Sequence, residues 1–234
     1  MKKSICYIIT GCMIAGTFQS IPSAAKSTPK LSTEQVFLEK GNTKKVTMKG
    51  LSKKQVVKWT SGNSKIFSVS KKGKIKAKKA GAAKLTAKVG KKKYKCNVVI
   101  FPKIKMEYNN DVFTEERYKA LTKIELDGDY KVLDPVLLKM IYSKCAGASL
   151  RLRTEEEIKN DTPAPDSPNI IGMSTGPKLY LGENQSPLSI IYYVQNRITI
   201  DGEVYINESP EKFRETNKLI RKYGIIISLE GRYE

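Results

Sequence analysis

The sequence predicts two folded domains: a two-layer antiparallel β-sandwich, followed by a small α+β domain with an antiparallel sheet and two helices. Three observations predict this architecture. Between residues 35 and 100, short runs alternate apolar residues with Lys, Ser or Thr, and Gly-containing turns separate the runs about every ten residues. After residue 101, strand-like and helix-like periods are mixed. The length of 234 residues, with 40% hydrophobic residues, suits two domains.

The predicted sandwich spans residues 32–101 and centres on Trp59, the only tryptophan of the chain. Alternation along the strands assigns the side chains that face its interior. These predicted core residues are Trp59, Val69, Ile75, Leu85 and Cys96. Gly73 lies in a predicted hairpin turn, where glycine supplies the positive φ that a tight turn requires. Such short strands favour two small sheets packed face to face.

Four ordered motifs in this region carry a family resemblance. They are the segments Trp59 to Asn63, Val69 to Ile75, Ala77 to Val89 and Tyr94 to Val98. On these motifs the first domain resembles the bacterial immunoglobulin-like domain of group 2 over nearly all of its length. The resemblance implies an all-β Ig-like sandwich of the kind found on exported bacterial surface proteins, including adhesins and carbohydrate-active proteins. Such a module is often a spacer, so the resemblance implies no particular ligand.

Nearly all of the net charge of +20 belongs to the first domain. Residues 26–103 carry 23 Lys, no Arg, and only Glu34 and Glu39 as acidic residues, whereas residues 104–234 have a net charge of −3. We expect a polycationic surface that attracts anionic cell-wall polymer or glycan. The candidate contacts are Lys72, Lys74, Lys76, Lys91, Lys92 and Lys93.

A second interpretation of these lysines stays open at this point. Lysine on exposed or edge strands also prevents sheets from pairing edge to edge, so the lysines would then form only a solvated outer face. Specific nucleic-acid binding is not expected, because the first domain has no Arg and its aromatic residues occupy core-like positions.

The predicted α+β domain spans residues 111–234, after a linker at residues 102–110. Its two helices begin at Asp134-Pro135 and at Ser209-Pro210, where a capping residue precedes proline. Residues 225–229 form a predicted final strand. This half of the chain shows no family resemblance.

The sequence offers no catalytic constellation. It contains no His, which removes the commonest general base and the commonest metal ligand. Cys145 therefore has no His to activate it, and the carboxylates of Glu155, Glu156 and Glu157 would point in different directions on a helix. We expect no enzyme activity, no cofactor and no metal site. The alternative is a small hydrolase acting on cell wall or glycan, with carboxylates of the second domain brought together by folding.

Residues 1–25 have the pattern of a secretory signal peptide. Lys2 and Lys3 precede an apolar run, and small residues precede a predicted cleavage site after Ala25, which leaves residues 26–31 as a linker. A retained membrane anchor is one alternative, but the apolar run from Ile5 to Phe18 falls short of the about 18–20 residues that a span needs, so we expect no transmembrane span in the mature chain. Lipidation at Cys12 is the rival prediction, but this residue interrupts the apolar run and does not follow it.

Cys96 and Cys145 are the only cysteines beyond the predicted signal peptide. Two cysteines in different predicted domains do not make a disulfide framework, and buried free thiols are the favoured prediction. A bridge between the domains stays open.

Together these observations predict an exported bacterial protein, secreted or associated with the cell surface. Its predicted role is non-catalytic and adhesin-like, with the sandwich presenting the α+β domain. The expected partner is an anionic cell-wall polymer or glycan, or another surface protein.

Overall fold

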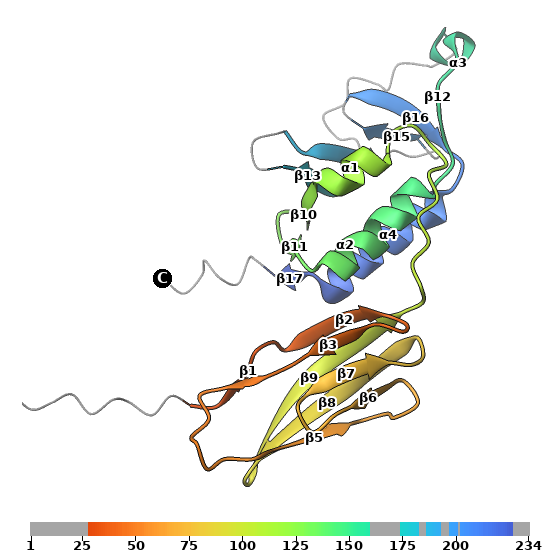
Figure 1. The fold of residues 1–234 in the computed structure, drawn as a ribbon. Coiled ribbons are helices and arrows are strands. Elements are labelled where there is room, and N and C mark those ends of the chain that lie inside the picture. Colours follow the sequence, from red (N-terminus) through yellow and green to blue (C-terminus); the bar gives the residue numbers. More distant parts are fainter. Residues whose placement is uncertain (1–27, 160–173, 183–185, 193–196, 201, 227–234) are drawn as a thin grey trace, which may run out of the picture.

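The computed structural model describes residues 28–159, 174–182, 186–192, 197–200 and 202–226. They form two domains, with the sandwich below the α+β domain in Figure 1. The predicted signal peptide, with Cys12, lies outside the described residues, as does the part of the last predicted strand beyond Ile226. None of the described helices is long and apolar enough to cross a membrane.

The first domain is built of short strands in three sheets. Its strands are β1 (Lys30–Leu31), β2 (Gln35–Glu39), β3 (Thr43–Lys45), β4 (Met48–Lys49), β5 (Val57–Ser61), β6 (Phe67–Val69), β7 (Lys74–Ala77), β8 (Gly81–Val89) and β9 (Lys92–Phe101). One sheet has the order β2-β9-β8-β5, a second the order β3-β7-β6, and β1 pairs with β4. The predicted all-β sandwich is confirmed, but its strands are not all antiparallel. β2 and β9 are parallel, because both run toward the second domain.

The core of the sandwich lies between the four-stranded and three-stranded sheets. Ile75, Leu85 and Cys96 are fully buried there, and Trp59 and Val69 pack against them partly buried. The turn between β6 and β7 contains Gly73, whose φ is 76°. A Cβ atom on this glycine would lie 3.0 Å from the Trp59 ring and 2.3 Å from a backbone carbonyl oxygen, so the turn accepts glycine alone.

The second domain combines one antiparallel sheet with helices. Its strands are β10 (Leu121–Leu126), β11 (Tyr130–Val132), β12 (Leu150–Leu152), β13 (Ser174–Leu181), β14 (Leu188–Tyr192), β15 (Arg197–Ile200), β16 (Glu203–Asn207) and β17 (Ile225–Ile226). Its helices are α1 (Glu115–Ala120), α2 (Pro135–Ala146), α3 (Glu155–Lys159) and α4 (Pro210–Tyr223). The sheet has the order β12-β16-β15-β14-β13-β10-β11-β17. The predicted α+β class is confirmed, and α1 and α3 are short helices added to the two predicted ones.

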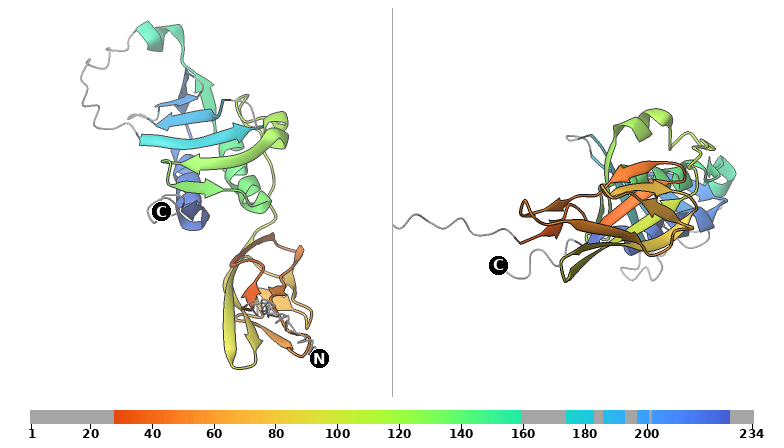
Figure 2. Two further views of the ribbon diagram at one scale, coloured as in Figure 1. Left: turned by 90° about the vertical axis from the view of Figure 1, so that its left-hand side faces the viewer. Right: turned by 60° about the horizontal axis from the view of Figure 1, so that its bottom comes forward.

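The two long helices, α2 and α4, lie side by side against one face of this sheet (Figures 1 and 2). Asp134 caps α2, since its Oδ1 accepts a hydrogen bond from the backbone N of Val136 at 2.9 Å. Pro135 and Pro210 are the first residues of the two helices, as the sequence predicts. Apolar side chains of both helices and of the inner sheet face form one core.

This core extends across the junction into the sandwich. The outward-facing side chains of Phe37, Val99 and Phe101 belong to it, although their strands also form the sandwich. The rings of Phe37 and Phe101 are stacked with centroids 6.2 Å apart, and the Tyr223 ring at the end of α4 meets them edge-on at 5.5 and 6.3 Å. The junction is therefore a packed apolar contact.

Polar contacts surround these rings and fix the orientation of the domains. The Glu39 carboxylate accepts a hydrogen bond from Lys139 Nζ of α2 at 2.8 Å and another from the backbone N of Ile104 at 3.0 Å. Lys44 of β3 pairs with the capping Asp134 at 3.2 Å. The segment predicted as a linker at residues 102–110 is itself tied down, since Asn110 Nδ2 donates to carbonyl oxygens at the end of α2.

We predict that Phe37→Ala uncouples the two domains. Phe37 is 4% exposed, and Phe-to-Ala changes in cores cost about 3–5 kcal/mol. Trp59 fluorescence reports unfolding of the sandwich, and far-ultraviolet circular dichroism reports the helices. The two transitions in urea should coincide in the wild type and separate in the variant. The control is Val56→Ala, at a side chain that is 82% exposed. Coincident transitions in Phe37→Ala would contradict the coupling.

We also predict that acid loosens the junction through Glu39. Burial raises the pKa of Glu39, but the hydrogen bonds from Lys139 and Ile104 outweigh burial and hold the pKa below its usual value. Because the folded pKa of Glu39 is lower than the unfolded pKa of about 4.3, the ionised carboxylate stabilises the fold at pH above about 4.3. This stabilisation is lost as the pH falls through the folded pKa. Stability should fall below about pH 4 less steeply in Glu39→Gln than in the wild type. The control is Glu34→Gln, and identical pH profiles for wild type and Glu39→Gln would refute the prediction.

Candidate anion-binding face

The lysines predicted to contact a polyanion do not form one site. Lys74 and Lys76 lie on the outer face of the three-stranded sheet, with Lys72 in the turn before them. Lys93 lies on the outer face of the other sheet, and Lys91 and Lys92 lie at the hairpin between β8 and β9. The sandwich core separates the two faces, so a single extended ligand meets only one of them at a time.

The register of the four-stranded sheet gathers a different set of lysines. We call this set the lysine face; its members are Lys58, Lys84, Lys88, Lys93 and Lys95. All five are exposed, because their strand neighbours Leu85, Ala87 and Cys96 point into the core. Sequence alternation places Lys84 and Lys88 outward, but only the pairing of β5, β8 and β9 brings the other three beside them.

The lysine face carries positive charges directly opposite one another. Lys88 pairs with Lys58 on β5 and with Lys93 on β9, so three ammonium groups form a row across three strands. Side chains in such positions have Cβ atoms about 4.5–5.5 Å apart, and like charges there are destabilising. In the part of the chain that the structure describes, none of the five forms an ion pair. The only acidic residues of the sandwich are Glu39, on β2 beside the second domain, and Glu34, which directly precedes β2.

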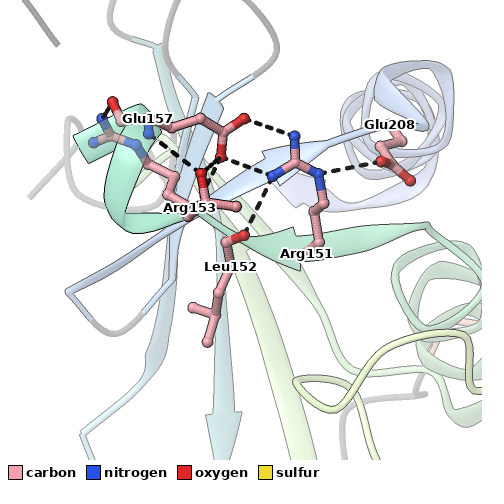
Figure 3. Close-up of polar contacts among 6 residues, drawn as sticks. Arg151, Leu152, Arg153, Glu157 and Glu208 are labelled. Carbon is pink, nitrogen blue, oxygen red and sulfur yellow. Dashed lines mark hydrogen bonds and ion pairs between the residues drawn. The ribbon is translucent and has the colours of Figure 1, made fainter. Parts of the chain in front are cut away.

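Of the three neighbouring glutamates considered as catalytic carboxylates, Glu157 is held in a network of ionic and hydrogen-bonded contacts. Figure 3 shows Glu157 held by Arg151 in a two-pronged pair, with N···O distances of 2.7 and 2.8 Å. Glu157 also accepts from the backbone N of Thr154 at 2.8 Å, and Thr154 Oγ1 accepts from the backbone N of Glu157 at 3.2 Å. This reciprocal arrangement is a capping box at the start of α3. Glu208 contacts the other side of the same guanidinium at 3.5 Å.

These contacts keep the Glu157 carboxylate without a proton near neutral pH, whereas a general acid must hold a proton that it can donate. The hydrogen bonds from Arg151 and from Thr154 lower the pKa of Glu157 to about 2. The thiols are equally poor nucleophiles, since burial raises the pKa of Cys96 to about 11 and that of Cys145 to about 12. Both cysteines are free. Within the described residues, no three His, Cys, Asp or Glu side chains are grouped so that they could hold a metal ion.

Residues 28–98 match the family described as bacterial Ig-like domain (group 2). The first domain is a group 2 bacterial Ig-like domain. No family is assigned to the rest of the chain, and no curated protein matches the sequence.

Several solved structures resemble parts of the chain. They include domains 4 and 5 of the S-layer protein SbsC (26% identity, TM-score 0.28, 32% of this chain and 51% of that chain), SbsC domains 1–6 (17% identity, TM-score 0.30, 74% and 25%) and an EHEC O157:H7 intimin mutant (15% identity, TM-score 0.27, 70% and 91%). The chain thus spans about half of the first of these structures and a quarter of the second. TM-scores this low carry no functional argument.

Protection of sheet edges does not explain the lysine face of the Ig-like domain. β5 is an edge strand, so Lys58 fits that explanation. β8 and β9 are central strands, with partners on both sides, and they carry the other four lysines. On the opposite sheet Lys45 faces Lys74 across β3 and β7, but that face is smaller. Among these four, Lys88 and Lys93 stand directly opposite each other, whereas Lys84 faces Asn97 and Lys95 faces Thr86, so edge protection accounts for Lys58 alone.

We predict that Lys88→Glu stabilises the Ig-like domain. The change converts two repulsive cross-strand pairs into attractive ones, so the free energy of unfolding should rise by about 0.5–1 kcal/mol at low salt. The gain should shrink in about 1 M salt, which screens exposed charges. Urea unfolding followed by Trp59 fluorescence measures the effect. The matched control is Lys65→Glu, an exposed lysine outside the lysine face. If Lys65→Glu raises the free energy of unfolding by the same amount, the stabilisation comes from the lower net charge and not from the cross-strand pairs.

Proposed function

We propose that this is an exported bacterial protein that binds an anionic polymer of the cell surface, without catalysis, through the lysine face of its Ig-like domain. The observation that carries the proposal is the row formed by Lys58, Lys88 and Lys93, whose repulsion lowers stability and which has no carboxylate partner among the described residues. Binding surfaces of proteins are among the places where stability is given up for function, and this row fits such a surface.

The distribution of charge supports the same function. Residues 26–103 have a net charge of +21 and residues 104–234 one of −3, so the field that attracts a polyanion arises from the Ig-like domain. The packed junction holds the α+β domain in a fixed orientation to the lysine face. The Ig-like domain thereby anchors the molecule, and the α+β domain stays close to the bound polymer.

Export rests on the predicted signal peptide at residues 1–25 and on the family of the first domain. The absence of His and the pKa values of Glu157, Cys96 and Cys145 support a role in binding over one in catalysis.

The test is a salt series on two triple variants that remove the same charge. One is Lys84→Gln, Lys88→Gln, Lys93→Gln on the lysine face, and the other is Lys45→Gln, Lys74→Gln, Lys76→Gln on the opposite sheet. The probe is immobilised inorganic polyphosphate, with neutral dextran as the blank. About five lysine contacts at about 0.7–0.9 released ions each give a log–log salt slope of about 3.5–4.5 for the wild type.

We expect this slope to fall by about 2 in the lysine-face variant, with a corresponding loss of affinity, and to change little in the control. Equal losses in both variants would show that attachment follows net charge and not the lysine face. Binding that is insensitive to salt would contradict the proposal altogether.

A further inference from the structure

A cleft of about 430 Å³ lies at the junction of the two domains. We call it the junction cleft. The Ig-like domain contributes Glu34, Gln35 and Asn97 to its walls, and the α+β domain contributes Lys131 and the ring of Tyr223. Its volume is within the range of about 300–1,000 Å³ that small-ligand sites occupy, and junctions of domains are a preferred place for such sites.

The junction cleft is continuous with the lysine face. Asn97 lies directly opposite Lys84 on β8 and directly opposite Gln35 on β2. Lys95 precedes Asn97 by two residues and so projects from the same side of β9, about 7 Å away along the strand. A polymer lying on the lysine face along β9 therefore reaches the cleft without leaving the sheet surface.

The cleft offers hydrogen bonds where the lysine face offers charge. Among the described residues, the side-chain amides of Gln35 and Asn97 have no hydrogen-bond partner, although each can donate and accept. They stand on paired strands whose backbones lie about 4.8 Å apart, so both amides can reach hydroxyl groups of one sugar ring. Lys131 and Glu34 add one donor and one acceptor at the walls.

We propose that the junction cleft binds a hydroxyl-bearing unit of an anionic polysaccharide whose flanking charged groups lie on the lysine face. This inference rests on the proposed function and names its ligand class: an acidic glycan, in preference to a polyanion that lacks hydroxyl groups. Charge on the lysine face supplies attraction, and the two amides supply selectivity, because hydroxyl groups satisfy both their donors and their acceptors.

The experiment compares two polyanions on the full chain. The probes are chondroitin sulfate, which carries sugar hydroxyls, and inorganic polyphosphate, which has only phosphates along its chain. The variants are Gln35→Ala, Asn97→Ala in the Ig-like domain and Lys131→Gln in the α+β domain. The control is Asn42→Ala, an exposed amide outside the cleft. Trp59 fluorescence verifies that each variant is folded.

The double amide variant should bind chondroitin sulfate about tenfold more weakly, as the loss of two or three hydrogen bonds predicts, and should bind polyphosphate as the wild type does within about twofold. Lys131→Gln should also weaken chondroitin sulfate binding more than polyphosphate binding, and Asn42→Ala should change neither. If the wild type binds polyphosphate, and the double amide variant binds chondroitin sulfate as tightly as the wild type does, the proposal for the junction cleft is wrong and the proposal for the lysine face stands. A wild type that binds neither polyanion would overturn both proposals.

Discussion

The contact of Phe37 and Phe101 with Tyr223 makes two domains into one unit. On an isolated sandwich these outward-facing phenylalanines would form an apolar patch exposed to water. The end of α4 covers them, and the apolar area removed from water provides the affinity between the domains. The Glu39–Lys139 pair beside the rings then selects one orientation, because a partly buried ion pair contributes more to geometry than to net stability.

Strand β9 shows how one sheet face serves several purposes. Its outward side chains change along the strand from Lys93 and Lys95, through Asn97, to Val99 and Phe101. Charge is thus placed at the free end, hydrogen-bonding capacity in the middle and apolar surface at the junction. The order matches how far each position is exposed to water, since water reaches the lysines freely and is excluded from the phenylalanine rings.

The sequence predicts those features that depend on local patterns and fails on those that depend on pairing. Alternation identifies the sandwich strands, and Asp134-Pro135 identifies the start of α2, because both signals lie within a few residues. Density of lysine in the chain points to Lys74 and Lys76, whereas the lysine face depends on the register between β5, β8 and β9. The junction is hidden for a similar reason. In Val36-Phe37-Leu38 three apolar residues are consecutive, so alternation cannot show that Phe37 belongs to the other core.

Under the export proposed above, the two free cysteines set a condition on how the chain folds. Cys96 is enclosed in the core of the sandwich and Cys145 contacts Thr216 in the core of the other domain, so the native structure keeps the thiols apart. An oxidising compartment can join them only while the chain is unfolded, and a crosslink formed then would hold together segments that must enter separate cores. For a chain exported in this way, collapse of either domain must precede oxidation, so that rapid folding, and not a covalent bridge, protects the thiols.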